Sequence, residues 1–324
     1  MISLPDFKEK QILFVNNEWG KSAHLRFNND NIVFEKDEEV VNRVSVHKTF
    51  AVFILGDLSL TTNFIKNIKE HGVSIFLLKN NFELYGSFAA VAEGHYLLRM
   101  KQYALTEQRE FEMAKNLVAN KIANQIALLR TRAIDDVVRS DLIERDEKYQ
   151  KSVRMAETDE ILLGIEGSAS RIFYKEYFMG IKWLRRAPRT KEDITNLLMD
   201  MGYTFLFNFV DSLLRLHGFD TYKGFYHKLF FQRRSLACDI MEPYRCLVDR
   251  QIMKSYNLKQ INEADFKFLK GAYQLSFDKH SKYAQIFLQC IMDSKEEIFS
   301  YVHGFYRSIM DEQKNEFPYF KLPV

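Results

Sequence analysis

Residues 95–130, HYLLRMKQYALTEQREFEMAKNLVANKIANQIALLR, place apolar side chains at the spacing that is typical of long α-helices. The same spacing continues through most of the chain that follows, with breaks expected near Pro188, Gly218, Gly224 and Pro243. Upstream of residue 95 the pattern is different. The stretch therefore predicts the start of a long helical region.

The first 90 residues consist mainly of short apolar or alternating segments separated by Asn, Asp and Gly turn signals. These segments are QILFVN, HLRFNNDNIVFEK, VNRVSVH, TFAVFILG and VSIFLLK, and one helix is expected over residues 60–71. We predict an α+β fold, with a small β-sheet domain over residues 1–88 and a larger all-helical domain over residues 89–324. We expect the first domain to mediate dimer contacts, because it lacks clustered basic groups and any acid and histidine constellation.

Composition limits the class of protein and the partners it can have. A chain of 324 residues with 47% apolar content can bury a large core, and its size favours two domains. Residues 1–90 carry 10 Lys or Arg and 11 Asp or Glu, which leaves 36 and 32 of the totals of 46 and 43 for the rest. The small basic excess thus lies in the helical part, so a nucleic-acid surface there requires local clusters.

The cysteines and the apolar stretches bear on location. Cys238, Cys246 and Cys290 form no CxxC pair and no even disulfide set, which favours a reducing cytoplasm. The apolar stretch around residues 203–210 is far shorter than the roughly 20 residues that cross a bilayer. We therefore expect no membrane span.

Glu166 is a carboxylate within an apolar helical stripe that also contains Leu162, Ala169 and Phe173. A buried ionised group needs a cation or a set of hydrogen bonds. Taken alone, this pattern favours an ion pair with a structural arginine such as Arg171 over a metal ligand.

A second group of polar side chains lies in residues 224–245, GFYHKLFFQRRSLACDIMEPYR. Asp239 and Glu242 are three residues apart and share a helical face, and His227 can lie beside them if the intervening loop folds back. Singly, each of these residues is more often structural than functional. With Glu166, however, they would form a mixed oxygen and nitrogen set suited to Mg²⁺ or Mn²⁺.

Basic residues surround these acids in the sequence, as a phosphodiester substrate would require. We expect DNA contacts from six of them, although a solvated basic loop is an equal alternative for the arginine cluster. They are Arg185, Arg186, Arg189, Lys228, Arg234 and Arg245.

Three segments together resemble the CRISPR-associated integrases, the Cas-one family: GIEGSASRIFY, RRAPRTKEDITNLLMDMGYTFL and GFDTYKGFYHKLFFQRRSLACDIMEPYRCLVDR. The resemblance implies that Glu166, His227 and Glu242 are catalytic metal ligands, and that Asp239 orients His227 or a bound water. It also implies a homodimer that joins a small Cas-two partner and acts on double-stranded DNA. Arg233 and Cys238 depart from the usual pattern, in which Gly and Leu are common.

The implied reaction is transesterification, in which a DNA 3′-hydroxyl attacks a repeat phosphodiester and inserts new spacer DNA. A stand-alone metal-dependent nuclease that uses water, and a non-catalytic DNA-binding scaffold, remain alternatives. Because carboxylates repel one another without metal, we also expect that replacing one of the ligands leaves the metal-free thermal midpoint unchanged or higher.

Overall fold

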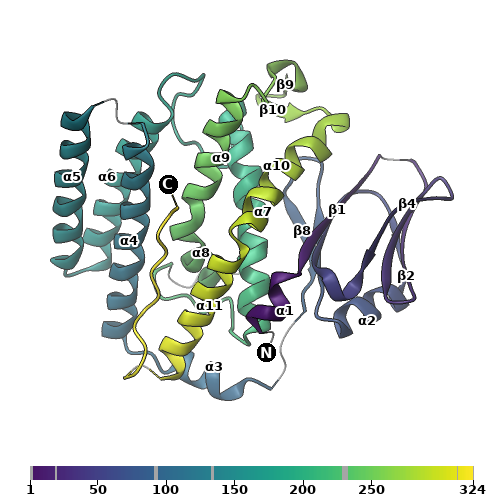
Figure 1. Ribbon diagram of the computed structural model, residues 1–324, viewed down its shortest axis with the longest axis horizontal. Coiled ribbons are helices and arrows are strands. Elements are labelled where there is room, and N and C mark those ends of the chain that lie inside the picture. The colour runs from purple at the N-terminus through teal and green to yellow at the C-terminus, as the bar shows by residue number, and fades with distance from the viewer. Residues whose placement is uncertain are drawn as a thin grey trace.

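The computed structural model describes residues 3–18, 20–90, 94–132, 135–227, 233–311 and 313–323. Strands dominate the part before residue 90, and helices dominate the part after it (Figure 1). The predicted α+β class is confirmed.

The N-terminal part is a sandwich of two four-stranded sheets. One sheet has the order β1-β5-β7-β8, in which β1, β5 and β7 are parallel and β8 is antiparallel to β7. The other has the order β4-β3-β2-β6. The elements are α1 (Leu4–Lys8), β1 (Gln11–Asn17), β2 (Ala23–Asn28), β3 (Asn31–Lys36), β4 (Glu39–Ser45), η1 (Val46–Lys48), β5 (Thr49–Gly56), β6 (Ser59–Leu60), α2 (Thr62–Glu70), β7 (Ser74–Leu78) and β8 (Leu84–Phe88).

Strand β5 is apolar throughout because both of its faces are covered. Val52 and Ile54 pack in the core between the two sheets. Phe53 points the other way, and its ring lies edge-on to Phe205 of the helical part with centroids 5.1 Å apart. The continuous apolar run, rather than an alternating one, is therefore the sequence mark of a strand buried on both faces.

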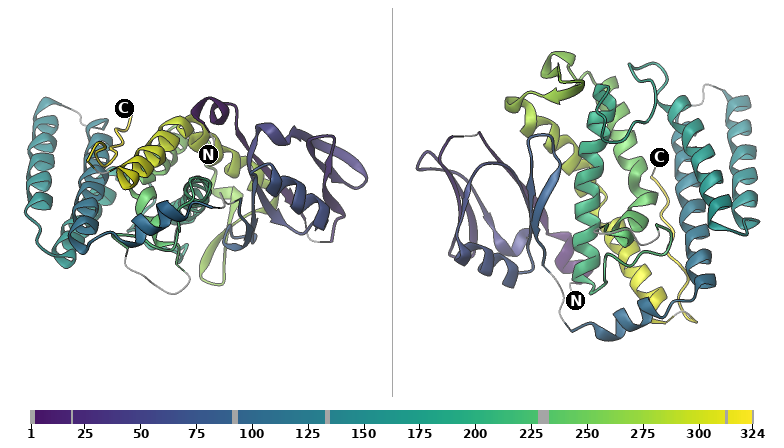
Figure 2. Two further views of the ribbon diagram at one scale, coloured as in Figure 1. Left: turned by 90° about the horizontal axis from the view of Figure 1, so that it is seen from below. Right: turned by 180° about the vertical axis from the view of Figure 1, so that it is seen from behind.

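The C-terminal part consists of helices arranged around α7 (Figures 1 and 2). Its elements are α3 (Tyr96–Tyr103), α4 (Glu107–Arg130), α5 (Asp136–Arg154), α6 (Asp159–Tyr177), α7 (Ile194–Leu216), α8 (Ser235–Met241), η2 (Glu242–Tyr244), α9 (Arg245–Asn257), η3 (Glu263–Asp265), β9 (Phe266–Leu269), β10 (Ala272–Leu275), η4 (Phe277–Lys279), α10 (His280–Asp293) and α11 (Lys295–Met310).

This part is mostly rather than entirely helical, because β9 and β10 form an antiparallel hairpin. Lys270 and Gly271 link the two strands, and both have positive φ, at 52° and 80°. Two consecutive residues of this kind form the tight turn that suits a two-residue hairpin. The expectation of an all-helical second domain was wrong at this point.

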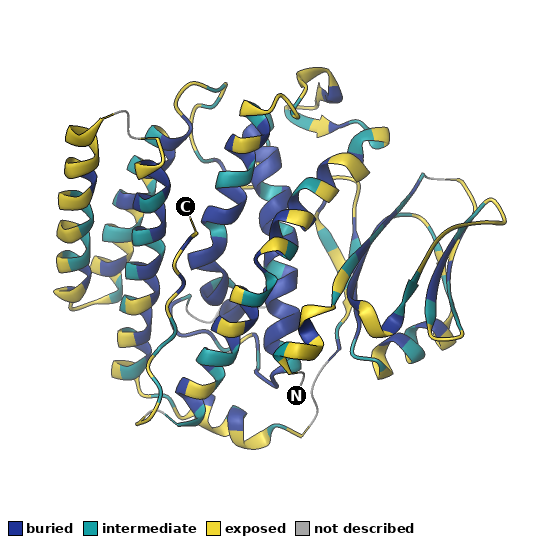
Figure 3. Ribbon diagram, viewed as in Figure 1, coloured by how far each residue is buried: buried dark blue, intermediate teal, exposed yellow. Residues whose placement is uncertain are grey.

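Helix α7 is long and apolar enough to cross a membrane by length and composition, contrary to the expectation from residues 203–210. However, 83% of its most apolar window is buried inside the protein, as its dark-blue ribbon in Figure 3 shows. The apolar composition of α7 is thus explained by its central place in the core.

The sheet and the helices share one core. Phe50 of β5 packs against Phe209 of α7 with ring centroids 5.1 Å apart, and Phe7 of α1 stacks on Phe299 of α11 at 4.8 Å. Removing residues 1–88 would therefore expose the apolar side of α7 to water. Such a deletion is expected to impair folding as well as assembly, so surface substitutions are the cleaner way to study dimer contacts.

Candidate active site

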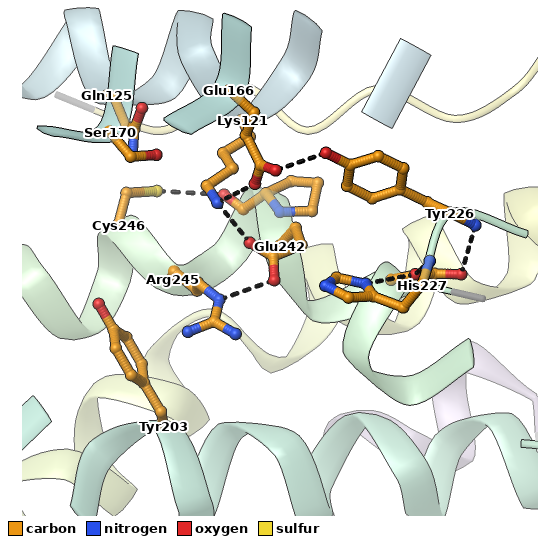
Figure 4. A network of polar contacts seen from close by, with 12 residues as sticks. Lys121, Gln125, Glu166, Ser170, Tyr203, Tyr226, His227, Glu242, Arg245 and Cys246 are labelled. Atoms are coloured by element: carbon orange, nitrogen blue, oxygen red, sulfur yellow. Dashed lines mark hydrogen bonds and ion pairs between the residues drawn. The ribbon is translucent and has the colours of Figure 1, made fainter. Parts of the chain in front are cut away.

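The two glutamates singled out in the sequence meet in space around a lysine (Figure 4). Glu166 projects from α6, and Glu242 is the first residue of η2, directly after α8. Lys121 of α4 forms ion pairs with Glu166 Oε1 and, at 2.7 Å, with Glu242 Oε2. None of the three side chains is more than 14% exposed. The ammonium thus neutralises two carboxylates away from bulk water.

A second cation completes the charge balance. Arg245 Nε lies 3.0 Å from Glu242 Oε1. Burial raises the pKa of Glu242, but the charges of Arg245 and Lys121 outweigh burial and lower it to about 2. Burial likewise lowers the pKa of Lys121, and the two carboxylates outweigh it and raise the value. Glu242 is therefore ionised and paired with two cations, Lys121 and Arg245.

His227 is held by Asp239 of α8. The His227 ring Nδ1 lies 2.6 Å from Asp239 Oδ1, and the same oxygen accepts the His227 backbone N–H at 2.8 Å. The other oxygen of Asp239 accepts the backbone N–H groups of Phe225 and Tyr226. The opposite edge of the imidazole, with Nε2, faces Glu242 in Figure 4. Asp239 thus fixes both the backbone of residues 225–227 and the imidazole nitrogen that faces the site.

Tyr226 is a site residue that the sequence reasoning missed. Its hydroxyl donates to Glu166 Oε2 at 2.5 Å, so the two oxygens of Glu166 have different partners, a phenol and an ammonium. Lys121 was missed as well. A lysine within the apolar stripe of Leu117, Val118 and Ile122 was the available signal, since such a group needs a buried carboxylate.

The donor set fits a divalent cation. Glu242 Oε2 is buried and pairs with the Lys121 ammonium at 2.7 Å, so this oxygen already faces a cation that a metal ion could replace. Two carboxylates and an imidazole are suitable ligands for Mg²⁺ or Mn²⁺. Among the described residues, the triad of ligand atoms that all lie within 4.8 Å of one another is elsewhere, so a metal ion would have to draw the ligand atoms of Glu166, His227 and Glu242 closer together.

Three of the arginines expected at DNA are held inside the protein. Arg186 pairs with Asp200 at 2.7 Å, and Arg234 pairs with Asp211 at 2.6 Å. Arg245 binds Glu242 and lies over the Tyr203 ring, 4.8 Å from its centroid. These guanidinium groups therefore support the loops and the site in this structure rather than standing free for phosphate.

The remaining basic positions differ in exposure. Arg185 is 76% exposed and pairs at the surface with Glu192, and Arg189 is also exposed. Lys228 lies outside the described residues. Two arginines of the cluster are thus positioned where a phosphate could reach them.

The sequence pattern alone favoured an ion pair between Glu166 and a structural arginine such as Arg171, and this expected partner was wrong. The cation that pairs with Glu166 is Lys121, 45 residues earlier, rather than Arg171. With Lys121 and Arg245 present, the carboxylates do not face one another uncompensated. Loss of a glutamate should then leave a buried cation short of a partner, so the expected change in metal-free thermal midpoint becomes a decrease rather than a rise.

Residues 19–289 match the protein family described as CRISPR associated protein Cas1. A CRISPR-associated endonuclease Cas1 of Thermodesulfovibrio yellowstonii is 26% identical over 305 residues, which cover 90% of this chain and 96% of that protein. The match places the chain among CRISPR-associated proteins. More particularly, the chain belongs to the Cas1 family, which confirms the resemblance seen in its sequence.

Solved structures agree on the fold. A Cas1 protein from Thermotoga maritima superimposes with a TM-score of 0.80 at 21% identity, covering 94% of this chain and 99% of that one. A casposase bound to integration product also gives 0.80, at 17% identity, covering 96% and 94%. At these identities the likeness establishes the shared architecture of sandwich and helices.

The ion pairs of Lys121 predict a measurable change in stability. Lys121→Met should lower the metal-free free energy of unfolding by about 3–5 kcal/mol, because it leaves two buried carboxylates with one cation between them. Addition of Mn²⁺ should then raise the thermal midpoint more than in the unaltered protein, since the ion no longer competes with the ammonium.

Lys148→Met, on the exposed side of α5, is the matched control and should change neither the midpoint nor its response to Mn²⁺. Circular dichroism melts with and without Mn²⁺ provide the measurement. A Lys121→Met protein as stable as the control without metal would contradict the assigned ion pairs.

Proposed function

We propose that this protein is a CRISPR adaptation integrase that inserts new spacer DNA into the repeat array. The observation that carries the proposal is the convergence of Glu166, Glu242 and His227 from three separate segments on one buried, positively compensated centre. Family membership provides the biological context.

Glu166, His227 and Glu242 would hold a Mg²⁺ or Mn²⁺ ion. When bound, such an ion supplies charge stabilisation for in-line displacement at phosphorus and orientation for an attacking hydroxyl. The fit rests on the two carboxylates that already surround one cation, Lys121, and on the imidazole edge that Asp239 turns toward the site.

The chain's own residues prepare this centre in distinct ways. Lys121 forms ion pairs with both carboxylates and so holds them on one cation without metal. Tyr226 fixes one oxygen of Glu166, and Asp239 fixes the orientation of His227. Arg245 anchors the other oxygen of Glu242. Such fixed donors reduce the reorganisation needed when a charged substrate enters.

In the proposed reaction the 3′-oxygen of the incoming DNA forms a bond to a repeat phosphorus. The bond from that phosphorus to the repeat strand's own 3′-oxygen breaks, and the departing oxygen receives a proton. One phosphodiester replaces another, so the protein needs no covalent nucleophile. Its contribution is to position the two DNA ends and to stabilise charge.

Partners follow from the same proposal. Double-stranded DNA would be both spacer precursor and target, and a homodimer would join a Cas-two partner. A cytoplasmic location stays a prediction.

For the dimer, the edge strand β4 is the candidate surface, because Val40 and Val41 are 50% and 58% exposed there. Val41→Lys should shift sedimentation toward the monomer, and an unchanged dimer would exclude this surface.

A strand-transfer assay separates the proposed integrase from a nuclease or a scaffold. A labelled DNA fragment should become joined to a supercoiled array plasmid in the presence of Mn²⁺ or Mg²⁺. Glu242→Gln should reduce joining by at least about 100-fold, because metal activation supplies several kcal/mol and each 1.36 kcal/mol is tenfold.

Glu144→Gln on the exposed side of α5 is the control and should retain joining. Cleavage without joining would support the nuclease. Binding with neither reaction would support the scaffold, and either result would overturn the integrase proposal.

The exposed arginines give a separate prediction for DNA affinity. The double variant Arg185→Ala/Arg189→Ala should reduce the slope of log affinity against log salt by up to about 1.8, at roughly 0.9 for each duplex phosphate that the protein no longer neutralises. Arg43→Ala/Lys48→Ala removes the same charge from the sandwich and should leave the slope nearly unchanged. If the unaltered protein and both double variants had equal slopes, Arg185 and Arg189 would belong to a solvated loop that does not contact DNA.

A further inference from the structure

A second group of metal-ligand side chains lies in the N-terminal sandwich. Asp30, His47 and His71 each offer a ligand atom, and all three atoms lie within 4.8 Å of one another. The sandwich therefore does contain an acid and histidine constellation, contrary to the expectation from the sequence. It lies at the opposite end of the molecule from α4 and α6, as two views agree (Figures 1 and 2).

The three side chains come from three different elements. Asp30 lies in the turn between β2 and β3, His47 lies in η1, and His71 caps the C-terminus of α2. The Asp30 carbonyl accepts the backbone N–H of Val46 at 2.9 Å, and Val46 is fully buried. This backbone hydrogen bond joins the turn to η1. It therefore keeps the Asp30 and His47 side chains near each other.

The imidazole of His71 is oriented as in many metal sites. Its Nδ1 lies 2.7 Å from the carbonyl oxygen of Asn67, and this contact requires the hydrogen on Nδ1. Nε2 is then left with its lone pair to bind a ligand. The ring of Phe27 supports it from the sheet, with centroids 5.6 Å apart. A backbone carbonyl behind a ligating imidazole fixes both its tautomer and its direction.

The remaining distances suit a small ion better than a direct contact. His47 Nε2 lies 3.7 Å from Asp30 Oδ2, which is too long for a hydrogen bond. Ligand atoms about 2.0–2.2 Å from one tetrahedral ion are roughly 3.3–3.6 Å apart. The rings of His47 and His71 have centroids 5.2 Å apart. Small rotations of exposed side chains would therefore close the group around an ion.

We propose that Asp30, His47 and His71 form a Zn²⁺-class site in the sandwich, separate from the candidate active site. Two imidazoles and one carboxylate favour Zn²⁺ or Co²⁺, whereas a larger share of carboxylate oxygens, as in the candidate active site, suits Mg²⁺ or Mn²⁺. Three protein ligands leave a position for water, so the ion exchanges with solvent. Its effect is to tie the β2–β3 turn, η1 and the end of α2 together, which stabilises the second sheet.

The test uses the full-length chain carrying His227→Ala, so that the candidate active site does not bind zinc through its imidazole. Titration calorimetry with Zn²⁺ should show one site per chain, and Co²⁺ should give the visible absorption bands of an imidazole-bound ion. Adding His47→Ala or His71→Ala should weaken Zn²⁺ binding at least about tenfold and remove these bands. Zn²⁺ should also raise the thermal midpoint only while the site is intact.

His24→Ala is the matched control, because His24 lies on β2 of the same sheet and contacts Ser22 rather than the group. It should retain both zinc binding and the midpoint shift. Circular dichroism confirms the fold of each variant. Equal binding in the His47, His71 and His24 variants, or no stoichiometric binding in any protein, would overturn the proposal.

This site is also independent of the proposed reaction. In a chain with His227 restored, His47→Ala should leave strand transfer with Mn²⁺ unchanged. Failure of the zinc site therefore leaves the integrase proposal intact, and failure of strand transfer leaves the zinc site intact.

Discussion

The structure of the candidate site depends on one buried lysine. Lys121 lies between Glu166 and Glu242, and each of the three residues belongs to a different part of the helical region. Two carboxylates in a poorly hydrated centre would repel each other and lose solvation, and one ammonium offsets both effects. A site assembled in this way already holds its two carboxylates on one cation before a metal ion arrives. Its ligands must exchange one cation for another rather than gather from solution.

The surroundings of Lys121 are organised to keep α4 in place. The buried side chains of Asn120 and Asn124, one turn apart on α4, bond the backbone of the C-terminal segment at Phe320 and Leu322. This segment runs along the helical part and covers α4 (Figure 1). Each bond satisfies a backbone group that would otherwise be buried without a partner. The last residues of the chain thus support the helix that carries the central cation.

Much of the architecture could be predicted from periodicity, because strands and helices bury their faces at different spacings. The short β9–β10 hairpin was missed. A four-residue strand has too few positions to show whether its apolar and polar residues alternate. Glu166 stood out because a carboxylate in an apolar stripe needs a partner, but its actual partner, Lys121, could not be found by spacing. Arg186 was expected at DNA because its partner, Asp200, comes from a different element, whereas Arg245 pairs with Glu242 only three residues earlier, a spacing that the sequence does contain.

The proposed metal centre is tested most directly by locating Mn²⁺ with anomalous diffraction from crystals of the protein soaked with that ion. One strong peak should lie within coordination distance of Glu166, His227 and Glu242, roughly 2.0–2.3 Å from their ligand atoms. The Lys121 ammonium should also have moved away from at least one carboxylate. A peak that avoids these three residues at saturating Mn²⁺, with both ion pairs of Lys121 intact, would contradict the proposed metal centre.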